Sequence, residues 1–275
     1  MTTAPVTLTV DVRTRPGAHL IAPLGLSTPH AAPLSVQVSG ATHYMVSDPG
    51  AAQHALWLTP DADQLRLRWA FAPQGAAYPE ALFAPRDSRY TRFADALAQE
   101  IRAMAPAGIK GIADHVASRF TYGHTDTRFY DGHDEIPQLC GLTRGSCIDI
   151  NAYFIACCRA AGVEAGYVTG YFIPEEKRSH CSDMHCWVVT RQNGVVQEWD
   201  IAHHLKMNTT DIRPGLNPKP GVRVPMAHSM GLNFAALGIA DLKLIAEPMW
   251  RDPDGSWTRA DMTIRLDGYD RLAGA

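Results

Sequence analysis

Apolar and polar residues alternate along the first part of the chain with a period of two. Every second side chain is apolar from Val6 to Arg13, and the same alternation returns from Leu65 to Phe71. This period is typical of half-buried strands. Shorter apolar runs between proline, glycine and aspartate residues predict strands at 34–38, 43–46 and 55–58. Residues 1–77 are therefore expected to form an antiparallel, sandwich-like β domain.

The period changes after residues 72–79, which are rich in proline, glycine and alanine and mark the predicted domain boundary. Apolar residues recur at steps of three and four from Tyr90 to Met104 and from Ile109 to Phe120, as in amphipathic helices. A nearly continuous apolar run at 145–162 predicts a third, buried helix. Residues 78–275 are expected to form an α+β domain in which this helix packs on an antiparallel sheet.

The pattern weakens toward the end of the chain. Residues 213–225 contain four prolines and two glycines, which predicts a loop. Residues 242–245 and 262–266 are expected to pair as a hairpin that turns near Asp254-Gly255.

The segment from Gly145 to Gly162 carries the clearest chemical signal. Ser146 is a natural N-cap, and Asp149 three residues later completes a capping-box pattern. Cys147 then occupies the first helical position, where unpaired backbone N–H groups and the helix dipole favour a thiolate. The same N–H groups can receive an oxyanion.

All six cysteines lie between residues 140 and 186. A secreted disulfide scaffold spreads its cysteines through a short chain, so clustering here favours reactive, metal-binding or buried apolar thiols. Four or five of the six are expected to be ordinary core or surface thiols. Cys157 and Cys158, deeper in the same helix, are expected to be inert.

The hairpin that follows is expected to supply a base and its orienting carboxylate. Asn193-Gly194 lies between two apolar-rich runs and predicts a two-residue type I′ turn. In that register Trp187 faces Asp200, and His185 and Asp200 are diagonal neighbours on one face, roughly 7–8 Å apart at the backbone. A carboxylate at one ring nitrogen leaves the other nitrogen free for the thiol of Cys147.

These segments resemble the bacterial transglutaminase-like superfamily, which includes cysteine peptidases. The resemblance rests on G-x-C at 145–147, R-x-x-G at 159–162, V-x-G-Y at 168–171, H-x-W at 185–187 and an aspartate at 200. It covers residues 78–211 and implies a papain-like core. By resemblance, Cys147 is the nucleophile, His185 the general base and Asp200 its partner. The amino-terminal region is more weakly similar to a domain that often precedes this core.

Three further residues are candidates for substrate or oxyanion binding: Tyr122, Ser146 and Trp187. Tyr122 belongs to an aromatic motif that family members carry before the cysteine, and ordinary packing is the alternative for Tyr122 and Trp187. The chain departs from the family pattern at Val189, where an acidic residue is common, and at Ile201-Ala202, where Pro-Thr often follows the aspartate. Both departures leave substrate specificity open.

A zinc site is one alternative, because His180-Cys181 and His185-Cys186 are followed by His203-His204. Adjacent strand residues point to opposite faces, so the four ligands of the two His-Cys pairs are not expected to converge. A second alternative is a catalytically inactive transglutaminase-like module that binds a partner.

The net charge of -3 offers no basic excess for phosphate groups, so neither nucleic acid nor an anionic membrane surface is an expected partner. No segment approaches the ~18–20 apolar residues of a membrane span. The first ten residues lack the features of a secretory signal, which predicts a cytoplasmic location. The oligomeric state is not predicted.

The expected function is cysteine-dependent acyl transfer on an amide bond through a thioester. Hydrolysis, as by a peptidase or amidase, is favoured over cross-linking because water is always available and no acceptor site can be read. The expected substrate is a peptide, a protein or a small amide. This chemistry requires no cofactor and no metal.

Overall fold

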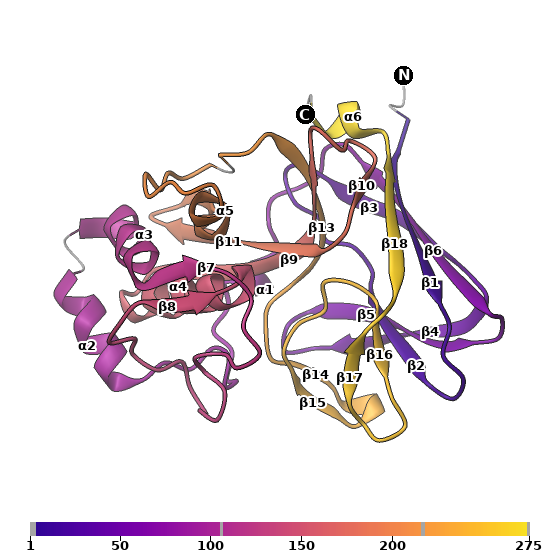
Figure 1. Cartoon of the computed structure of the whole chain (residues 1–275), viewed down its shortest axis with the longest axis horizontal. Coiled ribbons are helices and arrows are strands. Elements are labelled where there is room, and N and C mark those ends of the chain that lie inside the picture. Colours follow the sequence, from indigo (N-terminus) through magenta and orange to yellow (C-terminus); the bar gives the residue numbers. More distant parts are fainter. Residues whose placement is uncertain (1–3, 105–106, 216–217, 274–275) are drawn as a thin grey trace.

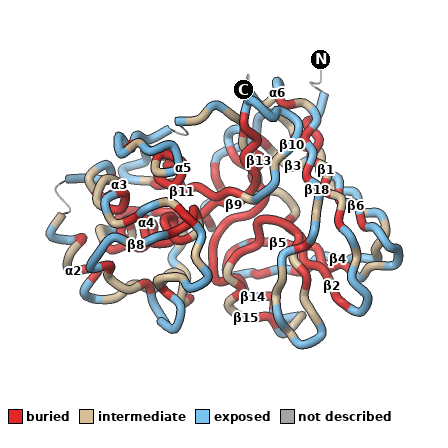
Figure 2. The backbone as a smooth tube through the Cα atoms, in the orientation of Figure 1, coloured by how far each residue is buried: buried red, intermediate tan, exposed pale blue. Residues whose placement is uncertain are grey.

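The computed structural model describes residues 4–104, 107–215 and 218–273. Most of the helices gather at one side of the molecule and the larger β-sheets at the other (Figure 1). Strand β9 (Glu164–Pro174) runs between them and is buried along nearly its whole length (Figure 2). Its Tyr167 belongs to the core on the helical side and its Tyr171 to the core of the β-rich side. Helices and antiparallel sheets together confirm the predicted α+β class.

Two five-stranded sheets form the β-rich side. In spatial order, one contains β10 (His180–Cys181), β18 (Met262–Asp267), β1 (Val6–Arg13), β6 (Gln64–Ala72) and β3 (Ala32–Ser39). The other contains β17 (Trp257–Arg259), β16 (Met249–Arg251), β2 (His19–Pro23), β5 (Gln53–Pro60) and β4 (Ala41–Asp48). Inward residues of the two sheets, such as Leu8 and Leu58, share one buried cluster. The five strands predicted before residue 77 are confirmed, and β2 was not predicted.

Strands from the end of the chain complete both sheets. β18 pairs with β1, and β16 pairs with β2. A unit made of residues 1–77 would therefore lack strands of each sheet, and the boundary between residues 77 and 78 stays a prediction.

The hairpin predicted from residues 242–245 and 262–266 is wrong. The turn at Asp254-Gly255 joins β16 and β17, two strands of three residues that the apolar pattern does not reveal. Residues 262–267 pair instead with β1, which lies near the other end of the sequence and has the same alternating pattern. β15 (Ile239–Leu242) pairs with β14 (Leu232–Phe234), and a single 3-10 turn (Ala235–Leu237) connects them.

A four-stranded antiparallel sheet lies behind the helices, in the order β12 (Val195–Trp199), β11 (Met184–Gln192), β9 and β13 (Gly221–His228). Asn193 and Gly194 both have positive φ, as a type I′ turn requires, and the β11–β12 register is confirmed from Gln192 opposite Val195 to Val188 opposite Trp199.

Beyond that point the predicted register is wrong. β12 ends at Trp199, and Asp200 begins the short helix α5 (Ile201–Lys206) as its N-cap. Trp187 therefore does not pair with Asp200. The capping hydrogen bond, from the His203 backbone N–H to the Asp200 carboxylate at 2.9 Å, stabilises this departure from the strand.

The loop predicted at 213–225 is also wrong in its last residues, because Gly221–Pro225 belong to β13. β13 is an edge strand that pairs only with β9, and its register shifts between Pro225 and Ala227. A proline is tolerated at an edge bulge because it removes no hydrogen bond from a central ladder.

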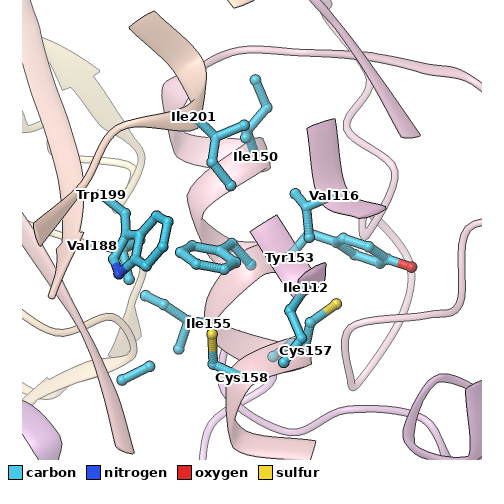
Figure 3. Close-up of a cluster of buried hydrophobic side chains, with 14 of the residues drawn as sticks. Ile112, Val116, Ile150, Tyr153, Ile155, Cys157, Cys158, Val188, Trp199 and Ile201 are labelled. Atoms are coloured by element: carbon cyan, nitrogen blue, oxygen red, sulfur yellow. The ribbon is translucent and has the colours of Figure 1, made fainter. Parts of the chain in front are cut away.

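Helix α4 (Cys147–Ala160) is the centre of the helical side (Figure 3). All its residues except Ile148 and Arg159 are buried, as the apolar run predicted. Ile150 projects from it toward Ile201, whereas Tyr153 projects to the other side of the helix, toward Val116 and Ile112. Burial of each large apolar side chain stabilises the fold by roughly 1.5–3 kcal/mol, so this packing holds the first turn of α4 in a fixed position.

Two helices flank α4: α2 (Asp95–Met104) and α3 (Gly108–Arg119). α3 is as predicted, but α2 begins five residues later than Tyr90. Phe93 forms an isolated bridge with Ile136, and the Ile136 N–H donates to the Arg92 carbonyl at 2.9 Å. These backbone bonds hold 92–94 extended. The remaining elements are α1 (Glu80–Phe83), α6 (Tyr269–Ala273) and the parallel pair β7 (Phe120–Tyr122) and β8 (Thr143–Gly145).

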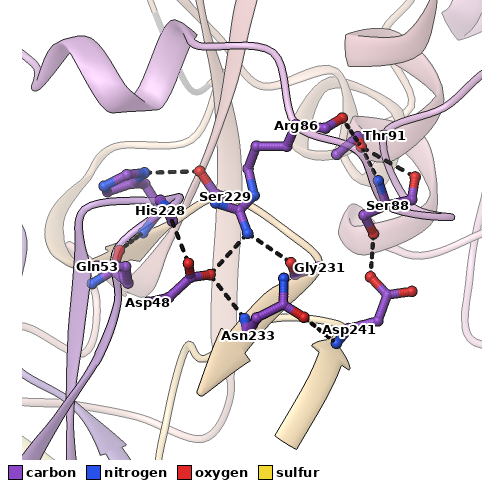
Figure 4. A network of polar contacts seen from close by, with 11 residues as sticks. Asp48, Gln53, Arg86, Ser88, Thr91, His228, Ser229, Gly231, Asn233 and Asp241 are labelled. Atoms are coloured by element: carbon purple, nitrogen blue, oxygen red, sulfur yellow. Dashed lines mark hydrogen bonds and ion pairs between the residues drawn. The ribbon is translucent and has the colours of Figure 1, made fainter. Parts of the chain in front are cut away.

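A buried polar network joins the β-rich side to the chain before α2 (Figure 4). Arg86 and Asp48 form an ion pair at 2.8 Å, and both side chains are almost fully buried. Asp48 also accepts a hydrogen bond from the Asn233 backbone N–H. The His228 N–H donates to the Gln53 side chain at 3.0 Å, so β4, β5 and β13 are tied together.

None of the helices within these described ranges is long and apolar enough to cross a membrane. The cytoplasmic location stays a prediction.

Candidate active site

The amino terminus of α4 holds Cys147. The Ser146 N–H donates to the Asp149 carboxylate at 2.8 Å, which confirms the predicted capping box. Gly162, two residues after the last helical residue, has a φ of +76°, as expected for the C′ position. Cys147 is only 6% exposed, yet it lines a cavity of about 560 Å³. The nucleophile candidate is thus both shielded and reachable.

Strand β11 supplies His185 and the N-cap of α5 supplies Asp200. The His185 Nε2 atom lies 2.6 Å from Asp200 Oδ2, so Nε2–H donates to the carboxylate. This bond leaves Nδ1 available to the sulfur of Cys147, which lines the same cavity as His185. The structure therefore brings together the three residues that the sequence predicted to meet.

Asp200 is fully buried and held by several donors. Its Oδ1 atom accepts from the His203 backbone, and its Oδ2 atom also accepts from Arg223 Nη2 at 2.6 Å. The imidazole Nδ1 of His203 lies 3.2 Å from the same oxygen. The His203 ring stacks on that of His185, with ring centroids 4.1 Å apart and planes 14° from parallel.

These contacts polarise the site. A hydrogen bond from Cys186 outweighs burial and, together with His185, lowers the pKa of Cys147 to about 5. Burial opposes protonation of His185, but the charge and hydrogen bond of Asp200 and the contact with Cys147 raise its pKa to about 9. Burial would also raise the pKa of Asp200, yet the surrounding cations hold it well below its usual range. At pH values between the pKa of Cys147 and the pKa of His185, the favoured state is a thiolate beside an imidazolium.

The other predicted site residues separate into two groups. Tyr122 and Ser146 line the cavity with Cys147. Tyr122 is opposite Gly145 in the β7–β8 pair, and the Ser146 hydroxyl donates to the Asp149 carboxylate. Trp187 lies outside the cavity lining and is 2% exposed. It packs among apolar residues on the opposite side of the sheet from α4, with the Arg223 guanidinium 4.8 Å from its ring.

Three residues of the site were missed by the sequence interpretation: Arg223, His203 and Cys186. Arg223 lay in the segment predicted to be a loop, although Val222 and Val224 on either side of it follow a strand alternation. His203 was considered only as a zinc ligand, and Cys186 only as a member of a histidine-cysteine pair. A helix start at Asp200 would have indicated His203, because N3 residues approach the N-cap side chain.

The zinc alternative does not match the arrangement of the donors. Among the residues that the structure describes, the ligand atoms of His185, Asp200 and His203 lie within 4.8 Å of one another, and neither Cys181 nor Cys186 joins such a set. The guanidinium of Arg223 on the same carboxylate oxygen opposes a cation there.

Comparisons with known proteins support the resemblance to the transglutaminase-like superfamily. Residues 92–195 match the model of the transglutaminase-like superfamily, a stretch that includes Cys147 and His185 and ends before Asp200. None of the curated proteins compared with this chain matches it.

Two solved structures resemble the chain. A candidate cysteine protease of Cytophaga hutchinsonii has a TM-score of 0.54 and 13% identity, over 96% of this chain and 91% of that protein. The periplasmic domain of TgpA from Pseudomonas aeruginosa has a TM-score of 0.38 and 15% identity, over 76% of this chain and 94% of that domain. The first likeness extends the shared fold to the β-rich side. Over residues 92–195 the chain is thus similar to the transglutaminase-like superfamily, as its sequence motifs predicted.

Proposed function

We propose that this chain is a cysteine-dependent acyl-transfer enzyme that acts on amide bonds, with Cys147, His185 and Asp200 as its catalytic triad. The observation that carries the proposal is the 2.6 Å bond from His185 to Asp200 beside a cysteine at a helix amino terminus. This arrangement supplies a nucleophile, a base and a group that orients the base.

In the first half of the reaction the Cys147 thiolate attacks the amide carbonyl carbon. A C–S bond forms, and the electron pair of the C=O bond moves to oxygen. Backbone N–H groups at the start of α4 receive that oxyanion. When the C–N bond breaks, the His185 imidazolium gives its proton to the departing nitrogen, and a thioester remains on Cys147.

Tyr122 is the side chain that we propose as a second oxyanion donor. It lines the cavity beside Cys147, and burial together with the nearby charge of Cys147 raises the pKa of its hydroxyl. The hydroxyl therefore keeps its proton and can donate it. Ser146 contributes through its position in the cap, since its own hydroxyl bonds to Asp149.

In the second half, an acceptor resolves the thioester while neutral His185 takes the acceptor's proton. We propose water as the acceptor, which makes the chain a peptidase or amidase, because the cavity opens to solvent and a small acceptor needs no dedicated site. The proposed substrate is a peptide, a protein or a small amide. The mechanism needs no cofactor.

Competitive alkylation near pH 6, read by peptide mass spectrometry, tests the nucleophile. Cys147 is expected to be modified well before the other five cysteines. His185→Ala is expected to slow this modification, because the thiolate loses its imidazolium partner. His180→Ala, which removes an exposed histidine on β10, is the matched control and should leave the rate unchanged.

Equal labelling of all six cysteines would contradict the proposal. Selective labelling of Cys147 without hydrolysis of any peptide or simple amide in a broad panel would favour the catalytically inactive module instead. Accumulation of cross-linked product with added amines, and no release of free acid, would identify a transferase.

A further inference from the structure

A second cavity, of about 600 Å³, lies beside the last turn of α4. Two arginines, Arg86 and Arg159, belong to its lining, and both also line a small neighbouring void. Cys147 and Arg159 stand at the two ends of α4, roughly 18 Å apart along the helix axis. Among the described residues, none lines both this cavity and the one that holds Cys147. The second cavity is therefore separate from the proposed active site.

Arg86 presents an unused donor at this place. Only 7% of its side chain is exposed. Its Nη2 atom donates to the Asp48 carboxylate and to the Gly231 carbonyl, each at 2.8 Å (Figure 4). Its Nε–H group has no hydrogen-bond partner in the described ranges of the chain. A buried donor without an acceptor is costly, so the position of Arg86 favours a molecule that supplies one.

Arg159 carries a positive charge without a counter-charge. Its Nε and Nη2 atoms donate to the neutral Ala165 carbonyl at 3.1 and 2.8 Å. Within the part of the chain that the structure describes, no carboxylate pairs with it. Burial lowers the pKa of Arg159 to about 10, and the nearby positive charge of Arg86 acts in the same direction. Because buried charges in proteins are normally paired, this guanidinium beside a second one indicates an anion.

The acidic residues of the lining limit how much negative charge that anion can carry. Glu164 is held by Arg191 through two hydrogen bonds at 2.7 and 2.9 Å. Glu135 is exposed to solvent. Both repel a second negative charge at the cavity, so a monoanion is favoured over a phosphate dianion.

The rest of the lining includes apolar surface. Phe83 is buried and Phe93 is partly buried, and Pro85 and Val163 also line the cavity. A planar guanidinium matches the geometry of a carboxylate, which can accept two parallel hydrogen bonds from it. The lining thus combines a charged end with an apolar wall.

We infer that this cavity binds a small organic carboxylate, whose charged end bonds to Arg159 and Arg86 and whose apolar body packs against Phe83 and Phe93. Such a ligand neutralises the guanidinium of Arg159 and gives the Arg86 Nε–H group an acceptor. The site goes beyond the proposed function, since its ligand is bound at the other end of α4 from the nucleophile.

Benzoate and benzamide are suitable probes, because they have nearly the same shape and differ in charge. Binding to the full chain is measured by isothermal titration calorimetry after Cys147 has been blocked with iodoacetamide, so that the amide is not hydrolysed. Benzoate is expected to bind at one site, and benzamide roughly tenfold more weakly or less. Equal affinity for the two probes, or no binding of benzoate, would overturn the inference.

Arg159→Gln keeps a donor for the Ala165 carbonyl but removes the charge, and is expected to weaken benzoate binding roughly tenfold. Arg102→Gln is the matched control, because Arg102 is an exposed arginine in the last turn of the neighbouring helix α2. It should leave the affinity unchanged. The same affinity in both variants would exclude Arg159 from the site.

If Arg159→Gln does not fold, photolabelling of the unmodified chain with 4-azidobenzoate decides. The label is expected within residues 83–93 and 159–164, and benzoate should displace it. A label confined to the cavity of Cys147, or spread over the surface, would contradict the site. Displacement by sulfate at lower concentrations than by benzoate would overturn the choice of an organic carboxylate as the ligand.

Discussion

The Nη2 atom of Arg223 lies 2.6 Å from Asp200 Oδ2, the same oxygen that accepts the hydrogen bond of His185. Both side chains of this ion pair are buried. A carboxylate that accepts from an arginine and a histidine at once stays ionised and cannot rotate away from either. Arg223, on β13, therefore links the position of the edge strand to the orientation of His185, the proposed base.

Arg223→Met is expected to destabilise the fold by roughly 3–5 kcal/mol, since it leaves a buried carboxylate with one cation fewer. It should also raise the pKa of His185, because a positive charge near an imidazolium disfavours its protonation. The basic limb of the pH–activity profile is then expected at higher pH than in the unmodified chain. Urea denaturation and pH–rate profiles measure the two effects.

Arg213→Met is the control for this prediction. Arg213 pairs with Asp211 on the surface, with both side chains largely exposed. Exposed pairs contribute ~1 kcal/mol or less, so stability and pH profile should hardly change. A similar response of the two arginine variants would show that Arg223 has no special link to Asp200.

Activity is expected to follow a bell-shaped pH profile. The reactive form needs the Cys147 thiolate and the His185 imidazolium together, and their pKa values are about 5 and about 9. Activity should rise as pH increases through about 5 and fall as pH increases through about 9. Steady-state rates on an amide substrate in buffers of constant ionic strength would test this, and a profile without an acid limb near pH 5 would contradict the ion pair.

The Asp200→Asn variant separates the role of Asp200 as the N-cap of α5 from the role of its negative charge beside His185. Asparagine is as good an N-cap as aspartate, so α5 should still form. The carboxylate that orients and charges His185 is lost, and the turnover rate is expected to fall by a factor of roughly 10⁴. Circular dichroism would establish that the variant folds. Turnover within a factor of about ten of the unmodified chain would exclude Asp200 from the triad.

The helix that begins at Cys147 and the hairpin that carries His185 were predictable because their signals are local. A capping box around Cys147 and a positive-φ turn at Asn193-Gly194 each determine their own structure within a few residues. From this turn the pairing of β11 with β12 was predicted correctly over five residue pairs. Hydrophobic alternation likewise predicted β1 and β6, which are long and buried on one face.

The parts that were not predicted depend on distant partners. β18 forms its pairs with β1, 250 to 260 residues away, so no local turn could indicate the partner. Arg223 reaches Asp200 because β13 returns to the edge of the central sheet. Phe93 leaves the helical pattern because Ile136 provides a bridge for its backbone. In each case a long-range hydrogen-bond ladder overrides the preference of the local segment.

His228 is expected to make the stability of the fold depend on pH below neutrality. It is buried beside the Arg86–Asp48 pair, and its ring bonds to the Ser229 hydroxyl (Figure 4). Burial, and next the charge of Arg86, lower its pKa to about 4. The unfolded chain, with an ordinary histidine, therefore binds a proton that the folded chain does not between about pH 6.5 and 4.

This contribution to stability is complete above about pH 6.5 and is lost as pH falls toward 4, by at most roughly 3 kcal/mol at ~1.4 kcal/mol per unit. In His228→Asn the decline over this window should be shallower by that amount, although the variant is less stable at pH 7. Urea midpoints at half-unit pH steps measure it, with His43→Asn on the exposed face of β4 as the control. Parallel stability curves for His228→Asn and the control would mean that His228 takes up its proton equally in both states.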